Sequence, residues 1–96
     1  DLPKSMPVKR DLALLIDAAT TFADVETVIQ NSEKRLLKSV TLFDVYEGKN
    51  LEAGKKSYAV SMTLQDDEKT LNDKQIDAVM KKIITNLQKQ LGAQLR

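Results

Sequence analysis

The stretch from Lys56 to Leu64 most narrows the folds open to this chain, because apolar and small residues alternate along it without interruption. On an extended strand the larger apolar side chains share one face and the small ones the other: Tyr58, Val60, Met62 and Leu64 against Ser57, Ala59, Ser61 and Thr63. Successive side chains of a strand point to opposite faces of its sheet. The pattern predicts a strand with one buried face and one face that a partner can approach closely.

Three further strands and two helices are predicted around it. The strands cover residues 8–17, 36–46 and, as a short edge strand, 93–96. Thr21 with Asp24, and Asn72 with Gln75, have the spacing of capping boxes at helix starts. Apolar residues then recur at helical spacing: Phe22, Val25, Val28 and Ile29 in the first helix, and Ile76, Val79, Met80, Ile83, Leu87 and Leu91 in the second.

The order β-α-β-β-α-β predicts an α+β fold of the ferredoxin-like kind, a four-stranded antiparallel sheet with two helices on one face. A chain of 96 residues fits one domain with one core. Residues 1–7 contain both prolines and are expected to form a linker or lead-in, which leaves residues 8–96 as the domain.

Composition excludes several classes of function. The chain has no cysteine and no histidine, so disulfides, histidine-based zinc sites and the common nucleophile systems are ruled out. Its net charge of +1 does not indicate that the chain binds nucleic acid through its overall charge. The carboxylates at residues 66–68 do not have the spacing of a calcium loop, so no metal site is expected. No apolar run reaches the roughly 18 residues that would span a bilayer.

Asp44 and Tyr46 are the first candidates for a functional site. They lie two residues apart, so on a regular strand they share a face, and Phe43 and Val45 are expected to point toward the helices. Tyr46 is either a half-buried strand aromatic or a platform that stacks on an unpaired base. Asp44 is either a turn former or an acceptor for a base edge. The apolar Val40 and Leu42 have the parity of Asp44, so either they are exposed too or a bulge intervenes.

Other candidates are weaker when taken one at a time. Ser57 would lie near Asp44 and Tyr46 if the second and third strands form a hairpin. Lys56 beside it is either a phosphate contact or a solubilising charge. Lys9 and Arg10 at the start of the first strand, with Arg96 at the end of the last, would form a basic rim or would simply be exposed charges.

Five short motifs, in order and with spacing kept from about Pro7 to Arg96, resemble the ferredoxin-fold anticodon-binding domain. They are Pro7-Val8-Lys9-Arg10-Asp11-Leu12-Ala13, Ser39-Val40-Thr41-Leu42-Phe43-Asp44-Val45-Tyr46, Gly54-Lys55-Lys56-Ser57, Thr70-Leu71-Asn72-Asp73 and Leu91-Gly92-Ala93-Gln94-Leu95-Arg96. Lys69 stands where the family usually has arginine.

The resemblance implies a function as well as a fold. Domains of this family lie at the C-terminus of the β subunit of bacterial phenylalanine–tRNA ligase and bind the anticodon stem-loop of its tRNA. That enzyme is cytoplasmic and contains two α and two β subunits. ATP and magnesium act in the α subunit, so this domain would hold no cofactor and no catalytic site. By resemblance Tyr46 stacks on the first anticodon base, Asp44 and Ser57 hydrogen-bond around it, and Arg96 lies near the loop.

Two alternatives remain open from sequence. The lack of an internal insertion favours the bacterial β-subunit form over the single-chain mitochondrial enzyme without proving it. The second hypothesis is a ferredoxin-like module that binds a small molecule or a partner subunit, since such folds host many functions.

Overall fold

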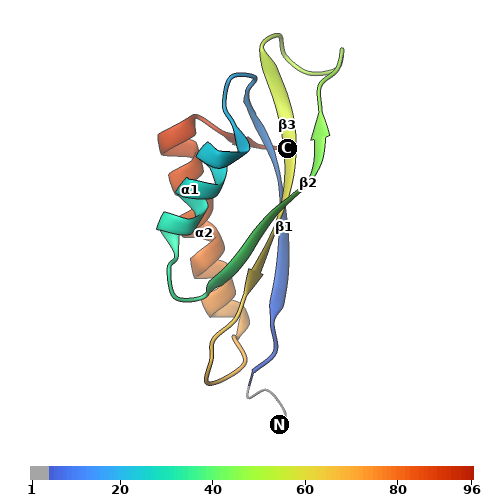
Figure 1. The fold of residues 1–96 in the computed structure, drawn as a ribbon. Helices are drawn as coiled ribbons and strands as arrows, with labels where there is room; N and C mark the ends of the chain where they lie inside the picture. The colour runs from blue at the N-terminus through green and yellow to red at the C-terminus, as the bar shows by residue number, and fades with distance from the viewer. Residues whose placement is uncertain (1–4) are drawn as a thin grey trace.

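The computed structural model describes residues 5–96 and has the predicted element order. The elements are β1 (Val8–Asp17), α1 (Phe22–Ser32), β2 (Leu37–Tyr46), β3 (Lys55–Leu64), α2 (Asp73–Leu91) and β4 (Gln94–Leu95). The four strands form one sheet in the order β2-β3-β1-β4, and every neighbouring pair is antiparallel. Both helices lie on the same side of this sheet (Figure 1). The ferredoxin-like α+β fold expected from the sequence is therefore confirmed.

Both helices begin where the sequence predicts, and for the predicted reason. The Thr21 side chain accepts from the Asp24 backbone N–H at 3.1 Å, and the Asp24 carboxylate accepts from the Thr21 N–H at 3.1 Å. Asn72 and Gln75 exchange the same pair of bonds at the start of α2, at 2.8 and 3.0 Å. At the end of α2, Gly92 takes a left-handed conformation with φ of 64°, which glycine adopts without a Cβ penalty.

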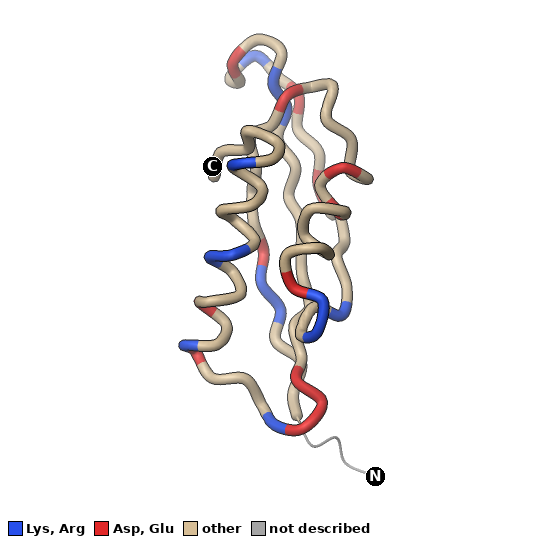
Figure 2. The backbone as a smooth tube through the Cα atoms, turned by 90° about the vertical axis from the view of Figure 1, so that its left-hand side faces the viewer, with Lys and Arg blue, Asp and Glu red and all other residues tan. Residues whose placement is uncertain are grey.

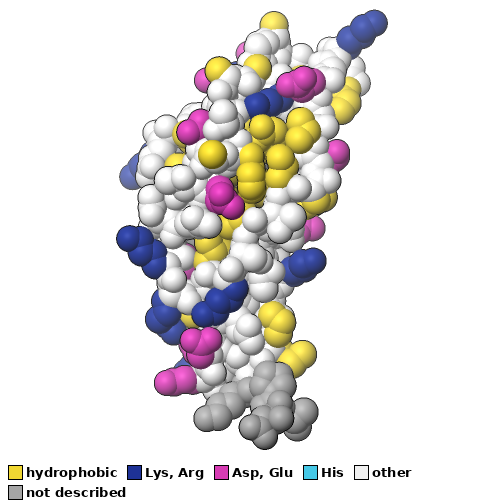
Figure 3. All heavy atoms as spheres, viewed as in Figure 1, with side chains coloured by type: hydrophobic (Ala, Val, Ile, Leu, Met, Phe, Trp, Pro, Cys, Tyr) yellow, Lys and Arg dark blue, Asp and Glu magenta, His cyan; other side chains and the backbone are white. Residues whose placement is uncertain are grey.

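The core fills the layer between the helices and the sheet. It contains the alternate residues Tyr58, Val60, Met62 and Leu64 of β3, together with the apolar faces of α1 and α2. The Ser32 hydroxyl donates to the Val28 carbonyl at 2.7 Å and accepts from the Asn86 amide at 2.9 Å, which ties the end of α1 to α2. In Figure 3 apolar side chains reach the surface between α1 and the hairpin end of β2 and β3.

Two irregularities in β2 settle the parity question left open by the sequence. The register between β2 and β3 shifts between Leu37 and Ser39 and again between Leu42 and Asp44. At the second shift Leu42 pairs with Val60 and Asp44 with Ala59, so Phe43 is the extra residue of a β-bulge. Leu42 therefore packs on the core, while Asp44 joins the opposite face.

The predicted lead-in, residues 1–7, is described only from Ser5 onward. Ser5 is buried, and its carbonyl and hydroxyl both accept from the Gln65 side-chain amide at 3.3 Å. The Met6 backbone N–H donates to the Thr70 hydroxyl at 3.3 Å. These contacts attach residues 5 and 6 to the connection between β3 and α2.

Charges of both signs are distributed along the chain, as Figure 2 shows from the side of the helices. Lysines occur at several levels of α2, and carboxylates gather at the turn of residues 66–68. Among the described residues, neither helix combines the length and apolar character needed to cross a membrane.

Candidate nucleic-acid interface

The sheet face turned away from the helices is lined mainly by small and polar side chains. Its centre is the row of Ser57, Ala59, Ser61 and Thr63 on β3, flanked in register by Leu15, Ala13, Asp11 and Lys9 of β1. We call this surface the open face. No helix covers it in Figure 1. Because its central side chains are short, larger groups at its margins can extend across it.

Tyr46, Asp44 and Ser57 meet on the open face near the β2–β3 hairpin. Tyr46 is the direct Cα partner of Ser57, and Asp44 is the partner of Ala59. The Tyr46 side chain is 41 % exposed, and Asp44 is exposed. Ser57, on the neighbouring strand β3, is buried. The expected placement of all three residues on one face is therefore confirmed, while their roles remain predictions.

Arg96 follows β4, the strand at the opposite edge of the sheet from β2, and its side chain approaches this group. Its backbone N–H donates to the Ala13 carbonyl at 2.9 Å, which extends the pairing of β4 with β1. Its guanidinium carbon lies 5.8 Å from the centre of the Tyr46 ring, within the range of a cation–π contact. In the register Arg96 is level with Ala13, Ala59 and Asp44, whereas Tyr46 belongs to the next row on the same face, with Ser57 and Leu15, so the arginine approaches the ring diagonally.

Gly48 lies beside the phenol end of the Tyr46 side chain. A Cβ built on Gly48 would collide with the hydroxyl and Cζ of Tyr46 and would lie 3.0 Å from its Cε2 atom. A side chain at position 48 therefore cannot coexist with the observed ring position. Gly48 and Arg96 thus both adjoin the ring, and no sequence pattern had indicated a role for Gly48.

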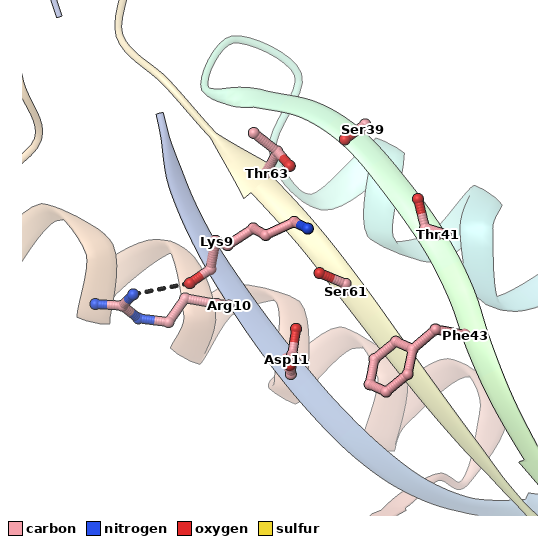
Figure 4. Close-up of a pocket in the computed structure, with 8 residues that line it drawn as sticks. All are labelled: Lys9, Arg10, Asp11, Ser39, Thr41, Phe43, Ser61 and Thr63. Atoms are coloured by element: carbon pink, nitrogen blue, oxygen red, sulfur yellow. Dashed lines mark hydrogen bonds between the residues drawn. The ribbon is translucent and has the colours of Figure 1, made fainter. Parts of the chain in front are cut away.

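Lys56 and Arg10 are not part of this group. Lys56 has the parity of Tyr58 on the helix side, is 8 % exposed, and places its ammonium 4.7 Å from the centre of the Tyr58 ring. Arg10 has the parity of the core-facing Met62 and donates to the Lys9 carbonyl at 2.9 Å. Figure 4 shows its side chain directed away from β2 and β3. The idea of one basic rim formed by Lys9, Arg10 and Arg96 is wrong, because Arg96 lies level with Ala13 and turns toward Tyr46.

Lys55, at the start of β3, is engaged in a cross-strand pair. Its ammonium donates to the Asp17 carboxylate at 2.7 Å, and the two residues are direct Cα partners. This hydrogen bond is the main reason that the pKa of Lys55 is raised above its ordinary value. The pair holds the hairpin end of β3 against β1.

A hollow of about 630 Å³ occupies the rest of the open face. It is lined by Lys9, Arg10, Asp11, Ser39, Thr41, Phe43, Ser61 and Thr63. In Figure 4 the Phe43 ring extends from β2 over β3, and the Lys9 side chain extends over β3 from the opposite strand. The expectation that Phe43 points toward the helices is wrong, because the bulge places this residue on the open face. The conflicting parity of Leu42 and Asp44 was the only sequence signal for it.

The chain matches the family model described as "Ferredoxin-fold anticodon binding domain" over residues 3–96. The chain belongs to this family. It is also 66 % identical to the phenylalanine–tRNA ligase β subunit of Porphyromonas gingivalis over 96 residues, and 60 % and 58 % identical to those of Bacteroides fragilis and Bacteroides thetaiotaomicron. Each match covers 100 % of this chain but 12 % of the relative. The chain therefore spans about an eighth of the length of these curated relatives.

Membership of the family agrees with the geometry of the open face, which offers an aromatic ring, a carboxylate and an arginine on one uncovered sheet. Within residues 5–96, no three acidic, histidine or cysteine side chains come together in a way that could hold a metal ion. The arrangement suits binding of a flat, hydrogen-bonding ligand.

Proposed function

We propose that this chain binds the anticodon stem-loop of phenylalanine tRNA as part of a bacterial phenylalanine–tRNA ligase β subunit. The observation that carries the proposal is the half-exposed Tyr46 ring, held on the open face in register with Ser57 and beside Asp44. In this role the ring stacks on the first anticodon base, the Asp44 carboxylate accepts hydrogen bonds from that base, and the Ser57 hydroxyl donates or accepts them. Stacking of a base on an aromatic side chain contributes roughly 1–3 kcal/mol.

The charge of the chain is compatible with this role only if other parts of the enzyme supply much of the tRNA contact. The net charge is +1, and phosphate contacts dominate the affinity of most nucleic-acid binders. From its family, we place the chain in a cytoplasmic α2β2 ligase, in which the α subunit and the rest of the β subunit are its partners. In the proposed enzyme, ATP and magnesium act in the α subunit and not in this chain.

The test is a titration of the full-length protein that carries this chain with an anticodon stem-loop, at fixed salt concentration. Tyr46→Ala should weaken binding roughly 5- to 150-fold, because the stacking energy is lost. The matched control is Val45→Ala, which truncates an exposed apolar residue with the opposite parity on the same strand. Unchanged affinity of a folded Tyr46→Ala protein would overturn the proposed role. Dimerisation through the open face, without any effect on RNA, would instead support a protein-interaction module.

A further inference from the structure

Resting on the function proposed above, we propose that the hollow beside Phe43 binds a second unpaired nucleotide of the same RNA. This nucleotide neighbours the one on Tyr46, and the Phe43 ring is its stacking platform. The occupant is a single-stranded RNA nucleotide, recognised by stacking, by hydroxyl groups and by one ammonium group.

Phe43 is free to take this role because the core does not use it. The ring is 55 % exposed and belongs neither to the buried core nor to the partly buried residues packed against it. The bulge brings Phe43 to the same face as Asp44 and Tyr46, so β2 presents two aromatic rings with a carboxylate between them. Bulges often re-aim a side chain at a binding site.

The remaining lining of the hollow fits a nucleotide better than an apolar ligand. Four hydroxyl groups, those of Ser39, Thr41, Ser61 and Thr63, line it on β2 and β3. Hydroxyl groups both donate and accept, so they can bond base edges and the 2′-hydroxyl that distinguishes RNA. The volume of about 630 Å³ lies within the roughly 300–1,000 Å³ of small-ligand sites.

Charge favours an anionic backbone at one margin of the hollow. Within residues 5–96, Lys9 forms none of the ion pairs that engage Arg35, Lys38, Lys55 and Lys82. Its side chain extends over β3 toward Ser61 in Figure 4, where it can contact a phosphate. Asp11 on the same strand offers a carboxylate that can accept from a base amino group.

Continuity with the Tyr46 group points to a strand that runs along β2. Single-stranded RNA recognition on four-stranded sheets commonly stacks two or three successive bases on aromatic side chains of the sheet. Here the hollow begins where the Tyr46 group ends, and Phe43 and Asp44 occupy the same bulge. One extended RNA segment can therefore engage both platforms.

The experiment couples protein substitutions to single abasic nucleotides in the RNA. The full-length protein that carries this chain is titrated with anticodon stem-loops in which the loop bases are removed one at a time. Phe43→Ala should weaken binding of the intact loop roughly 5- to 150-fold. It should also abolish the penalty of one abasic position, while Tyr46→Ala abolishes the penalty of the adjacent one.

Controls separate stacking from structure. Phe43→Tyr should keep affinity within about twofold, since it retains a stacking ring, whereas Phe43→Leu keeps apolar bulk and should bind as weakly as Phe43→Ala. Val45→Ala serves as the surface control on the same strand. Thermal unfolding of each variant verifies that the fold is intact, and Phe43→Leu decides the matter if Phe43→Ala does not fold.

The outcomes distinguish the two proposals. If Tyr46→Ala weakens binding and neither Phe43→Ala nor Phe43→Leu does, the second platform is wrong and the proposed function stands. If neither position matters, the proposed function itself fails. A loss with Phe43→Ala that is coupled to no abasic position overturns stacking in favour of an indirect effect. Loss of self-association with unchanged RNA affinity would assign Phe43 to a protein contact instead.

Discussion

The Tyr46 ring is flanked by Gly48 and by the guanidinium of Arg96. A Cβ at Gly48 would collide with the phenol, and the guanidinium carbon of Arg96 lies 5.8 Å from the ring centre. A platform that is already oriented loses little side-chain freedom when a base stacks on it, and preorganisation of this kind favours affinity. At the residue scale, the candidate site therefore depends on the missing side chain of Gly48 as well as on the Tyr46 ring.

Gly48→Ala is expected to weaken RNA binding without unfolding the chain. The added methyl group forces the phenol end of Tyr46 to move, which a surface side chain can do at low cost to stability. Affinity for the stem-loop should fall in the Tyr46 background and should not fall further in a Tyr46→Ala background. Equal losses in both backgrounds would show that Gly48 acts through the loop and not through the ring.

Gly54→Ala is the control for that substitution in the same loop. A Cβ at Gly54 meets nothing within 4 Å, but its φ of 78° strains any other residue. This change should cost roughly 1 kcal/mol of stability or more, with RNA affinity unchanged in the folded protein. Urea unfolding and the stem-loop titration measure the two effects separately.

At the scale of elements, two acidic side chains organise the segments on either side of β2 and β3. Glu33 accepts from the backbone N–H groups of Arg35 and Leu36 at 3.2 and 3.1 Å, just before β2. Asp66 accepts from the Glu68 N–H at 2.9 Å and from the Arg35 guanidinium at 3.2 Å, just after β3. Arg35 therefore joins the entry to β2 with the exit from β3.

Both carboxylates are more acidic in the folded chain than in an unfolded one. Burial acts to raise the pKa of Glu33, but the hydrogen bonds from Leu36 and Arg35 and the charge of Lys82 lower it overall. The hydrogen bond from Glu68 chiefly lowers the pKa of Asp66, and Arg35 adds to the effect. A lowered folded-state pKa contributes stability above the unfolded value, and this stability is lost as the pH falls through the folded value.

Acidification should therefore destabilise the chain through these two turns. The free energy of unfolding should fall as the pH drops below about 4.5, the ordinary value of Glu33, and continue to fall below 3.8, that of Asp66. Asp66→Asn should lower stability at pH 6 and flatten the loss toward pH 3. Urea unfolding at both pH values measures this, with Asp67→Asn, an exposed carboxylate of the same turn, as the control. A pH dependence unchanged by Asp66→Asn would contradict it.

At the scale of the whole molecule, one core supports both layers. Leu14 and Ile16 of β1, Met62 and Leu64 of β3 and Ile83 of α2 are all at most 1 % exposed. β1 and β3 lie in the middle of the sheet and pair along ten positions from Val8 to Asp17. The same two strands carry the open face on one side and pack against the helices on the other.

Truncation in this core should affect both layers at once. Ile83→Ala, at a side chain with 0 % exposure, should cost about 2–5 kcal/mol, since it removes buried methyl groups and leaves a cavity. Unfolding followed by far-ultraviolet circular dichroism and by tyrosine fluorescence should shift together in urea. Lys81→Ala on the exposed side of α2 should change stability by less than about 0.5 kcal/mol. Separate transitions for the two probes would show that the layers are not one cooperative unit.

Local interactions determined what the sequence predicted correctly. Capping boxes at Thr21 and Asn72 and the alternation along β3 depend on residues within a few positions of each other, so the elements and their order follow from the chain itself. The shared face of Tyr46 and Ser57 was also predictable, because a hairpin pairs neighbouring strands.

Tertiary pairing decided the rest. The bulge at Phe43 exists because Leu42 packs on the core while Asp44 faces outward, and only the register with β3 reveals that one residue is extra. The Lys56 ammonium lies over the Tyr58 ring on the helix side, and the Arg96 guanidinium lies near the Tyr46 ring. The sequence by itself determined the strands, the helices and a face for Tyr46. Contacts between distant residues decided which side chains share that face, because a side chain's direction depends on the packing of its neighbours.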